Sequence, residues 1–250
     1  MRTACKLSAV VICLNEEEKI GDCLDSLSFA DEIVVIDSGS SDQTVSIVEN
    51  KGARLIYNRW RGYVDQKNFG VAKATGDWIL ILDADERISE SLKSEIISVL
   101  KNPTADGFSI PRLVWYLNRW IRYSGWYPAR KIRLFKKDKG IHTGDDQLHE
   151  KVIVNGKVKQ LNHDIYHLSF NNISAHLDTL NRFTEISANS RFESGKSTSV
   201  TSIFTRPIFT FLKSYFIKFG FRDGVAGFII GSLSAYHVFC KYLKIKEKFK

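Results

Sequence analysis

The chain has 250 residues, 44% of them hydrophobic, and carries a formal net charge of +8 at pH 7. This length allows one substantial hydrophobic core, so we expect one domain with an appendage. The four cysteines lack the paired spacing of a metal site, and the short apolar run near the N-terminus leads into acidic residues without a cleavage-like site. These features argue against a cysteine-ligated metal and a signal peptide, and favour reduced cysteines that pack in a cytosolic protein.

The first hundred residues alternate between strand and helix patterns. Apolar runs predict buried strands at 7–14, 32–37, 54–57 and 79–82. Helical spacing predicts a helix from about Ile20, and Asn15 with Glu18 resembles a capping box before it. Further helices are expected from about residue 43 to 50 and from 63 to 74. This alternation indicates a mainly parallel sheet with crossover helices.

Polar residues follow three of these predicted strands. Asn15 follows the first strand, Asp37 ends the second, and Asp83 and Asp85 follow the apolar run ILIL. The carboxyl ends of parallel strands form the edge where ligands bind in open α/β sheets. In an extended stretch the carboxylates of Asp83 and Asp85 would face one side and suit Mg²⁺ or Mn²⁺. The alternative is an acidic turn that closes the strand.

Four segments, VVICLNEEE, VVIDSGSSD, QKNFG and ILDADE, occur in this order and spacing over the first ninety residues. Together they resemble the donor-binding half of GT-A glycosyltransferases of family 2. The resemblance implies an α/β, Rossmann-like, mainly parallel sheet with flanking helices that binds a nucleoside-diphosphate sugar. It implies nucleotide-sugar contacts from Leu14, Asn15, Glu16, Asp37, Ser38, Lys67, Asp83, Ala84 and Asp85.

Two of these positions have simpler interpretations. Asp37 and Ser38 could form an Asx turn and cap the next helix. Lys67 could be a solvated charge on its helix.

The second half narrows the resemblance. The segments WYP, RKIRLF, LHEK, YHLS, NRF and KFGFRDG resemble the acceptor half of lipopolysaccharide inner-core β-1,4-glucosyltransferases, with departures at Phe183 and at Phe221 with Arg222. This resemblance implies transfer of a hexose, glucose from UDP-glucose, onto a heptose of the lipopolysaccharide inner core. We therefore expect a catalytic domain at 1–192, divided into a donor half at 1–100 and an acceptor half at 101–192.

Glycosyl transfer requires that the acceptor hydroxyl lose a proton as it attacks. Glu150 in LHEK is the candidate base, with Asp145 and Asp146 as rivals. A single base without a covalent carboxylate partner predicts one displacement with inversion.

The leaving diphosphate gains negative charge, which a divalent cation can neutralise. Mg²⁺ or Mn²⁺ on Asp85 is expected to do so, helped by Arg130 or Arg133. His167 could be a further metal ligand, although a hydrogen-bonded core histidine fits the same pattern.

Lysine and arginine are dense after residue 206 and are mixed with aromatic residues. This mixture predicts a basic amphipathic helical region at 203–250 that follows a polar linker at 193–202. We expect a helical hairpin on an anionic membrane, peripheral on the cytoplasmic face of a bacterial inner membrane. The uncharged stretch at 225–240 is short for a membrane span, and it could instead pack on the catalytic domain. No nucleic-acid motif accompanies the charge, so a nucleic-acid partner is not expected.

Two other functions use the same features. A polyprenyl-phosphate sugar transferase would share the donor half, but its acceptor is already an anion and would not need Glu150. A non-catalytic peripheral membrane protein that binds nucleotide or lipid would release no sugar from any donor.

Overall fold

The computed structural model describes residues 5–144, 150–170 and 172–249. The chain divides into two compact units. The first unit comprises Met1–Arg112 and Arg130–His167, and the second comprises Leu113–Ala129 and Leu168–Lys250. Neither unit is a continuous stretch of sequence.

The first unit contains a seven-stranded sheet in the order β12-β6-β9-β4-β1-β2-β3. Its strands are β1 (Leu7–Cys13), β2 (Glu32–Asp37), β3 (Arg54–Tyr57), β4 (Trp78–Asp83), β6 (Gly107–Ile110), β9 (Lys131–Lys136) and β12 (Val158–Gln160). Strands β4, β1, β2 and β3 run parallel, with Val10 opposite Val34 and Ile81, whereas β9 runs antiparallel to β4 and β6. The predicted α/β fold with a mainly parallel sheet is confirmed.

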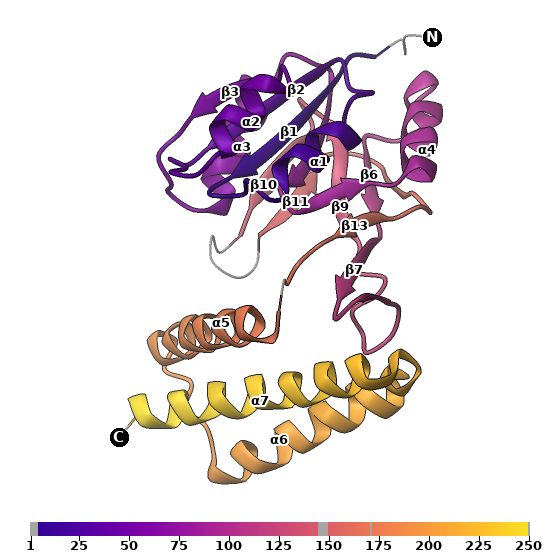
Figure 1. Cartoon of the computed structure of the whole chain (residues 1–250). Helices are drawn as coiled ribbons and strands as arrows, with labels where there is room; N and C mark the ends of the chain where they lie inside the picture. Colours follow the sequence, from indigo (N-terminus) through magenta and orange to yellow (C-terminus); the bar gives the residue numbers. More distant parts are fainter. Residues whose placement is uncertain (1–4, 145–149, 171, 250) are drawn as a thin grey trace. The chain divides into compact units, whose positions relative to one another are not determined.

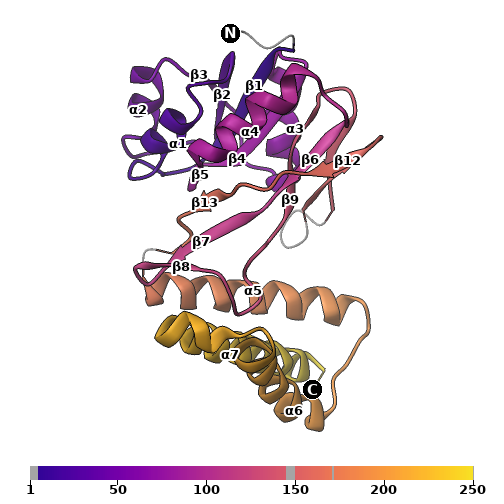
Figure 2. The same ribbon diagram turned by 90° about the vertical axis from the view of Figure 1, so that its right-hand side faces the viewer.

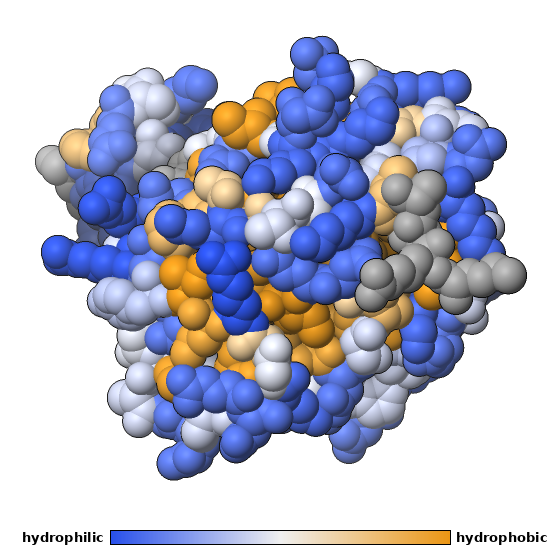
Figure 3. All heavy atoms as spheres, turned by 90° about the horizontal axis from the view of Figure 1, so that it is seen from above, coloured by the Kyte–Doolittle hydropathy of each residue, from blue (hydrophilic) through white to orange (hydrophobic). Residues whose placement is uncertain are grey.

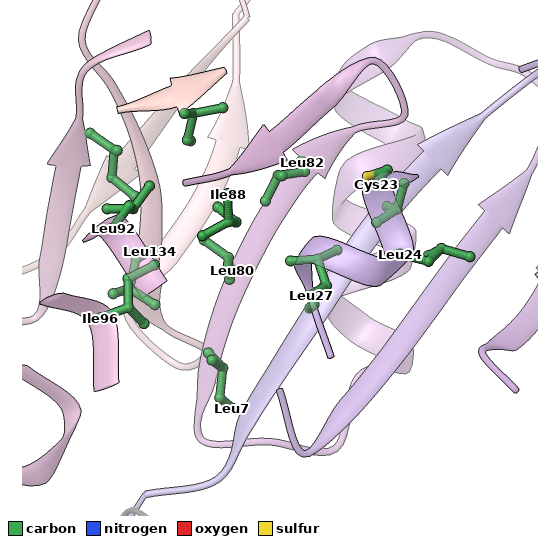
Figure 4. Packing of buried hydrophobic residues seen from close by; sticks show 14 of the residues in the cluster. Leu7, Cys23, Leu24, Leu27, Leu80, Leu82, Ile88, Leu92, Ile96 and Leu134 are labelled. Atoms are coloured by element: carbon green, nitrogen blue, oxygen red, sulfur yellow. The ribbon is translucent and has the colours of Figure 1, made fainter. Parts of the chain in front are cut away.

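Alternating side chains of the central strands pack on two faces of this sheet. Leu7, Leu80 and Leu82 point to the face covered by α1 (Ile20–Ser26) and α4 (Glu90–Lys101), as Figure 4 shows. Val10, Ile79 and Ile81 point to the opposite face and pack against α3 (Tyr63–Lys73). Helix α2 (Thr44–Asn50) adds Val48 to the first of these cores.

Helix α3 approaches β1 closely at Gly70. A Cβ atom at this position would lie 2.5 Å from Cγ1 of Val10 and 3.0 Å from Cγ1 of Ile36. The missing side chain therefore sets the depth of α3 against the sheet, and with it the position of Lys67 one turn earlier.

Short strands complete the first unit. Strand β5 (Glu86–Ile88) pairs antiparallel with β13 (Ile165–His167), with Glu86 opposite His167. Strands β10 (Gly140–Thr143) and β11 (Lys151–Val154) form a second antiparallel pair. The first pairing brings residues 86 and 167 to the same place from distant parts of the sequence.

The second unit contains β7 (Arg112–Tyr116) from Leu113 onward, β8 (Arg119–Ile121), α5 (Ile173–Glu193), α6 (Val200–Leu212) and α7 (Gly224–Lys248). Between α6 and α7 lie a π-helical turn, η1 (Lys213–Ile217), and a 3₁₀ turn, η2 (Gly220–Asp223). Helix α7 packs against both α5 and α6 (Figures 1 and 2).

The core of the second unit is formed around α7. Near its start, Ala226 and Ile230 pack with Tyr116 and Ile121, and near its end Ile245 packs with side chains of α5 and α6. Helix α5 thus packs with α6 and α7, although it lies before the predicted linker. The functional division at residues 192 and 203 stays a prediction.

Among the described residues, one helical stretch, Gly220–Lys248, is long and apolar enough by length and composition to cross a membrane. Within its most apolar window, 28% of the residues are buried. The surface drawn in Figure 3 is mostly hydrophilic, with apolar residues gathered near its centre.

Candidate functional site

The loops that follow β1 and β2 are joined at the carboxyl edge of the sheet. Oδ1 of Asn15 accepts a hydrogen bond from the backbone amide of Ser41 at 2.8 Å. The backbone amide of Asn15 donates to Ser40 Oγ at 2.9 Å. Asn15 has a φ of 53°, a left-handed conformation that asparagine tolerates better than most residues. The predicted capping box is wrong, because α1 begins at Ile20 and the Asn15 side chain bonds to the neighbouring loop.

Asp37 is buried at the end of β2. Its carboxylate accepts hydrogen bonds from the backbone amides of Gly39 and Ser40 at 2.8 and 2.9 Å, and from the Ser40 hydroxyl. This is the Asx turn that the sequence allowed, although it does not cap α2, which begins at Thr44. The Ser38 hydroxyl accepts from Nε2 of Gln66 at 2.8 Å. The nucleoside contacts of Asp37 and Ser38 stay predictions.

Leu14 and Glu16 belong to the same edge. Leu14 is exposed, with 47% of its surface accessible. Burial raises the pKa of Glu16, and the charge of Asp85 acts in the same direction. The charge of Asp85 therefore reaches Glu16 from a neighbouring loop.

A cluster of buried and half-buried charges lies beside this edge. Lys67 is 1% exposed, and its Nζ atom lies 2.9 Å from Oδ1 of Asp83 and 2.6 Å from Oε1 of Glu150. Nη2 of Arg133 lies 2.8 Å from Oδ2 of Asp83 and 2.7 Å from Oε1 of Glu86. We call Lys67, Asp83, Glu86, Arg133 and Glu150 the charge cluster. The interpretation of Lys67 as a solvated helix charge is wrong.

The charge cluster fixes the ionisation of its members. Burial raises the pKa of Asp83, but the charges of Lys67 and Arg133 outweigh it and hold the pKa well below its usual range. Burial likewise raises the pKa of Glu150, yet Lys67 brings it below the usual value. Burial lowers the pKa of Arg133, but the charges of Glu86 and Asp83 outweigh it and raise the pKa above its ordinary value. Both carboxylates, Asp83 and Glu150, are therefore ionised at neutral pH.

Asp85 has a different partner from Asp83. Residues 84 and 85 form a turn between β4 and β5, so the expectation of one extended face for both aspartates is wrong. Oδ2 of Asp85 lies 3.1 Å from Nε2 of His167, and these two residues are the predicted metal ligands. Ala84 is buried in this turn, and its carbonyl accepts from Nη1 of Arg87 at 3.0 Å.

The predicted metal site consists of two side chains in the part of the chain that the structure describes. No group of three His, Cys, Asp or Glu side chains that could hold a metal ion occurs among the described residues. One carboxylate and one imidazole can hold a divalent cation whose other ligands come from water and a diphosphate. The donor set fits such an ion, and its metal role stays a prediction.

Glu150 is the member of the charge cluster that was predicted to be the base. Within the described residues, its Oε2 atom is buried without a hydrogen-bond donor, while Lys131 lies 3.7 Å from Oε1. The rival bases Asp145 and Asp146 lie outside the described residues. Arg130 donates from Nη1 to the Leu161 carbonyl at 2.7 Å, and Nη2 of Arg133 is engaged with two carboxylates.

Several polar residues of this site escaped the sequence analysis. Glu86 is fully buried and joins Arg133 to Arg112, whose Nη1 lies 3.3 Å from Oε1. Asn68 exchanges two hydrogen bonds with the backbone of His142, at 2.9 and 3.0 Å. Glu86 lies in the segment ILDADE and Asn68 lies in QKNFG, two segments that carried the resemblance. Their place in these segments was the signal from which both residues could have been predicted.

Comparisons with known proteins identify the family of this chain. The family model described as Glycosyl transferase family 2 matches residues 8–150. The lipopolysaccharide core biosynthesis glycosyltransferase LpsC of Rhizobium meliloti is 30% identical, over 97% of this chain and 92% of its own. The chain therefore belongs to glycosyl transferase family 2, as the resemblance implied.

Two solved structures show the same fold. TarS 1-349 of S. aureus, in complex with UDP-GlcNAc, has a TM-score of 0.51 at 16% identity, and the match covers 98% of this chain and 91% of its own. Glucosyl-3-phosphoglycerate synthase of Mycobacterium tuberculosis, in complex with Mn²⁺, UDP and glucosyl-3-phosphoglycerate, has a TM-score of 0.50 at 17% identity. That match covers 78% of this chain and 82% of its own, and the predicted GT-A fold is confirmed.

Proposed function

We propose that this protein transfers a hexose, glucose from UDP-glucose, onto a heptose of the lipopolysaccharide inner core with inversion at the anomeric carbon. The observation that carries the proposal is the ammonium group of Lys67, which contacts both Asp83 at the end of β4 and Glu150, the predicted base. One side chain therefore separates the predicted base from the strand that is proposed to bind the donor. The similarity to LpsC supports the lipopolysaccharide acceptor.

Glu150 is proposed to act as the base, and the charge of Lys67 controls its basicity. Glu150 is ionised and has a buried oxygen without a donor among the described residues, so it can accept the proton of an attacking hydroxyl. The cost is that Lys67 lowers its basicity, and a base of low pKa accepts a proton less readily. We propose that Lys67 turns from Glu150 toward the diphosphate of the bound donor, which would return basicity to Glu150 when the donor is in place.

Asp85 and His167 are the side chains proposed to hold Mg²⁺ or Mn²⁺. Such an ion would neutralise the negative charge that develops on the departing UDP. The buried arginine of the charge cluster has a different role: it keeps Asp83 ionised and in place at the end of β4. Asn15 and Glu16, together with Leu14, are proposed to line the nucleoside.

The test is a transfer assay with the full chain, radiolabelled UDP-glucose, Mn²⁺ and lipopolysaccharide truncated to its inner-core heptoses. Glu150→Gln should lower turnover by roughly 10²–10⁴ with donor affinity nearly unchanged, because the amide cannot accept the proton. Asp85→Asn should abolish metal-dependent binding of UDP-glucose. Glu185→Gln, an exposed carboxylate in the second unit, is the matched control and should leave both measurements unchanged.

The same assay separates the competing functions. Full activity of Glu150→Gln on a polyprenyl phosphate, with no transfer to lipopolysaccharide, would indicate the polyprenyl-phosphate sugar transferase. Absence of transfer from any UDP- or GDP-sugar to either acceptor would favour the non-catalytic protein and contradict the proposal.

We place the reaction at the cytoplasmic face of the inner membrane, where nucleotide sugars are synthesised.

A further inference from the structure

The turn between α6 and α7 carries a cluster of exposed aromatic rings. Their ring centroids lie 5.1 to 6.5 Å from one or more neighbours in the cluster. Four of them are about half exposed, at 46% to 54%. We call this set the aromatic tip: Phe211, Tyr215, Phe216, Phe219, Phe221 and Phe228. Contiguous exposed apolar surface of this kind marks an interaction site in a folded protein.

An apolar stripe on α6 leads to the aromatic tip. Phe204, Ile208 and Leu212 recur every four residues, and 61%, 63% and 44% of their surfaces are exposed. Phe216 follows at the same spacing. The exposed face therefore runs along the helix and ends in the turn.

The backbone of the turn is held in place by polar contacts. The buried carboxylate of Asp223 accepts hydrogen bonds from the amides of Arg122 and Tyr123 at 3.3 and 2.9 Å, and the Lys218 carbonyl accepts from the Ser124 amide at 3.0 Å. Phe219 adopts a φ of 54°, which a phenylalanine rarely does. A flexible loop could turn its phenylalanines inward, but this turn holds them at the surface.

Glycine allows the close approach of α7 to the turn. A Cβ atom at Gly227 would lie 1.8 Å from the Gly220 carbonyl oxygen, and one at Gly220 would lie 2.8 Å from the Ser214 carbonyl oxygen. The turn is thus packed at its backbone, while its aromatic side chains are exposed.

The charge around the aromatic tip is of one sign. Between residues 194 and 246 the sole acidic residue is Asp223. Its side chain is buried and accepts the hydrogen bonds from the backbone that are described above. Lys213, Lys218 and Arg222 flank the exposed rings, and the Arg222 guanidinium lies 5.2 Å from the Phe219 ring centroid. A partner that binds here must offer an apolar region beside negative charge.

Helix α7 has partners inside the second unit, which argues against a membrane span. Ile230 and Ile245 are fully buried, and Nζ of Lys244 donates to Oδ1 of Asn181 at 2.8 Å and to Oγ1 of Thr184 at 3.0 Å. A helix that spanned the bilayer as a separate element would lose these contacts with α5.

We infer that the aromatic tip and the α6 stripe insert side by side into the interface of an anionic phospholipid bilayer, with the part of α7 that follows Phe228 outside the hydrocarbon. Lys213 and Lys218 meet the lipid phosphates, and the phenylalanines enter the boundary between headgroups and acyl chains. The inference goes beyond the proposed reaction, because lipid binding can be measured without donor or acceptor. Failure of one therefore leaves the other standing.

Flotation with vesicles of phosphatidylcholine, with and without phosphatidylglycerol, tests the inference on the full chain. Phe216→Ser with Phe221→Ser should weaken binding to both vesicles by at least about tenfold, because two large apolar side chains no longer leave water on binding. Val158→Ser, an exposed valine on β12, is the control and should float like the parent chain. Equal flotation of the phenylalanine variant and the parent would overturn the inference.

The electrostatic part has its own pair of variants. Lys213→Gln with Lys218→Gln should weaken binding to the anionic vesicles by about fivefold per charge at low salt and should spare the neutral vesicles. Lys101→Gln with Lys157→Gln removes the same charge from exposed positions of the first unit and should have little effect. Equal losses in the two pairs would mean that net charge alone acts, and would overturn the assigned surface.

Two further measurements separate bilayer insertion from misfolding and from self-association. Phe216→Trp should gain fluorescence that brominated phospholipids quench, which a chain with a damaged fold or a different membrane contact would not show. Sedimentation without lipid tests whether the same face joins two copies of the chain. A dimer that dissociates in Phe216→Ser with Phe221→Ser would assign the aromatic tip to self-association and reject the bilayer.

Discussion

The side chain of Lys67 lies in a position that is closed to water. Burial of an ammonium group is costly, and here Asp83 and Glu150 offset that cost with contacts of 2.9 and 2.6 Å. The lysine also separates two carboxylates that would otherwise repel each other. Removing Lys67 should therefore destabilise the fold strongly, as for a buried ion pair, whereas removing one partner of a surface salt bridge changes stability little.

Lys67→Met should lower the free energy of unfolding by about 3 kcal/mol, because it removes the nearest cation from Glu150 and one of the two cations that contact Asp83. Lys73→Met on the same helix removes an exposed lysine and should change stability by less than about 0.5 kcal/mol. Urea unfolding of both variants at pH 7 is the measurement. Similar losses in the two variants would show that Lys67 gains little from its partners.

His142 gives the fold an acid-sensitive group. Burial lowers its pKa to about 4, and the charge of Lys67 acts in the same direction. The imidazole is therefore neutral in the folded chain at pH values where the unfolded chain, with a pKa near 6.5, binds a proton. Stability should fall as the pH drops from about 6.5 to about 4, by up to about 3 kcal/mol.

His142→Phe should remove this part of the pH dependence, since phenylalanine keeps an aromatic ring against Phe135 and does not titrate. Unfolding of the parent and the variant should be compared at pH values of about 7 and about 4.5. The acidic groups titrate in both chains, so the difference between them isolates the histidine. Parallel pH profiles would contradict the assignment.

At the scale of elements, the depth of α3 against the sheet depends on one missing side chain. Gly70→Ala would push a methyl group to 2.5 Å from Cγ1 of Val10 and should cost about 1–3 kcal/mol. Gly21→Ala on α1 meets only Cγ2 of Ile47, at 3.6 Å, and should be neutral or slightly stabilising.

Thermal unfolding of the two alanine variants distinguishes a packing effect from helix propensity. If Gly70→Ala were as stable as the parent, α3 would be free to move outward from β1. Donor affinity of Gly70→Ala should then also be measured, because an outward movement of α3 would carry Lys67 away from Asp83.

Local patterns predicted the elements well where one physical signal dominates. Strands β2 and β3 have the predicted limits, and the helix that carries Lys67 ends within one residue of its expected end. The capping box failed because Asn15 had a competing partner, Ser41, that is distant in the sequence. The paired aspartates failed because a turn at residues 84 and 85 breaks the extended geometry on which the argument relied.

At the scale of the molecule, the edge of the sheet was predictable and the charge cluster was not. Apolar strands ending in polar residues identify Asp37, Asp83 and Asn15 as neighbours of one edge. The pairing of Arg133 with Asp83 requires that β9 insert between β4 and β6, and no periodicity in the sequence encodes that order. The resemblance named Asp83 and Lys67, and the need for a base named Glu150, but the contacts that these residues share depend on the topology.

The path of the chain between its two units also shapes how the protein is made. Residues 113–129 belong to the second unit, and Tyr116 there packs with Ile230 of α7. The ribosome must add more than a hundred residues between these partners, roughly 6 to 20 s of synthesis at the usual bacterial and eukaryotic rates. During that interval the apolar side chains of β7 and β8, such as Tyr116 and Ile121, have not yet met the residues of α7 that cover them. A nascent chain of this family member is therefore a natural client for a chaperone until α7 has emerged.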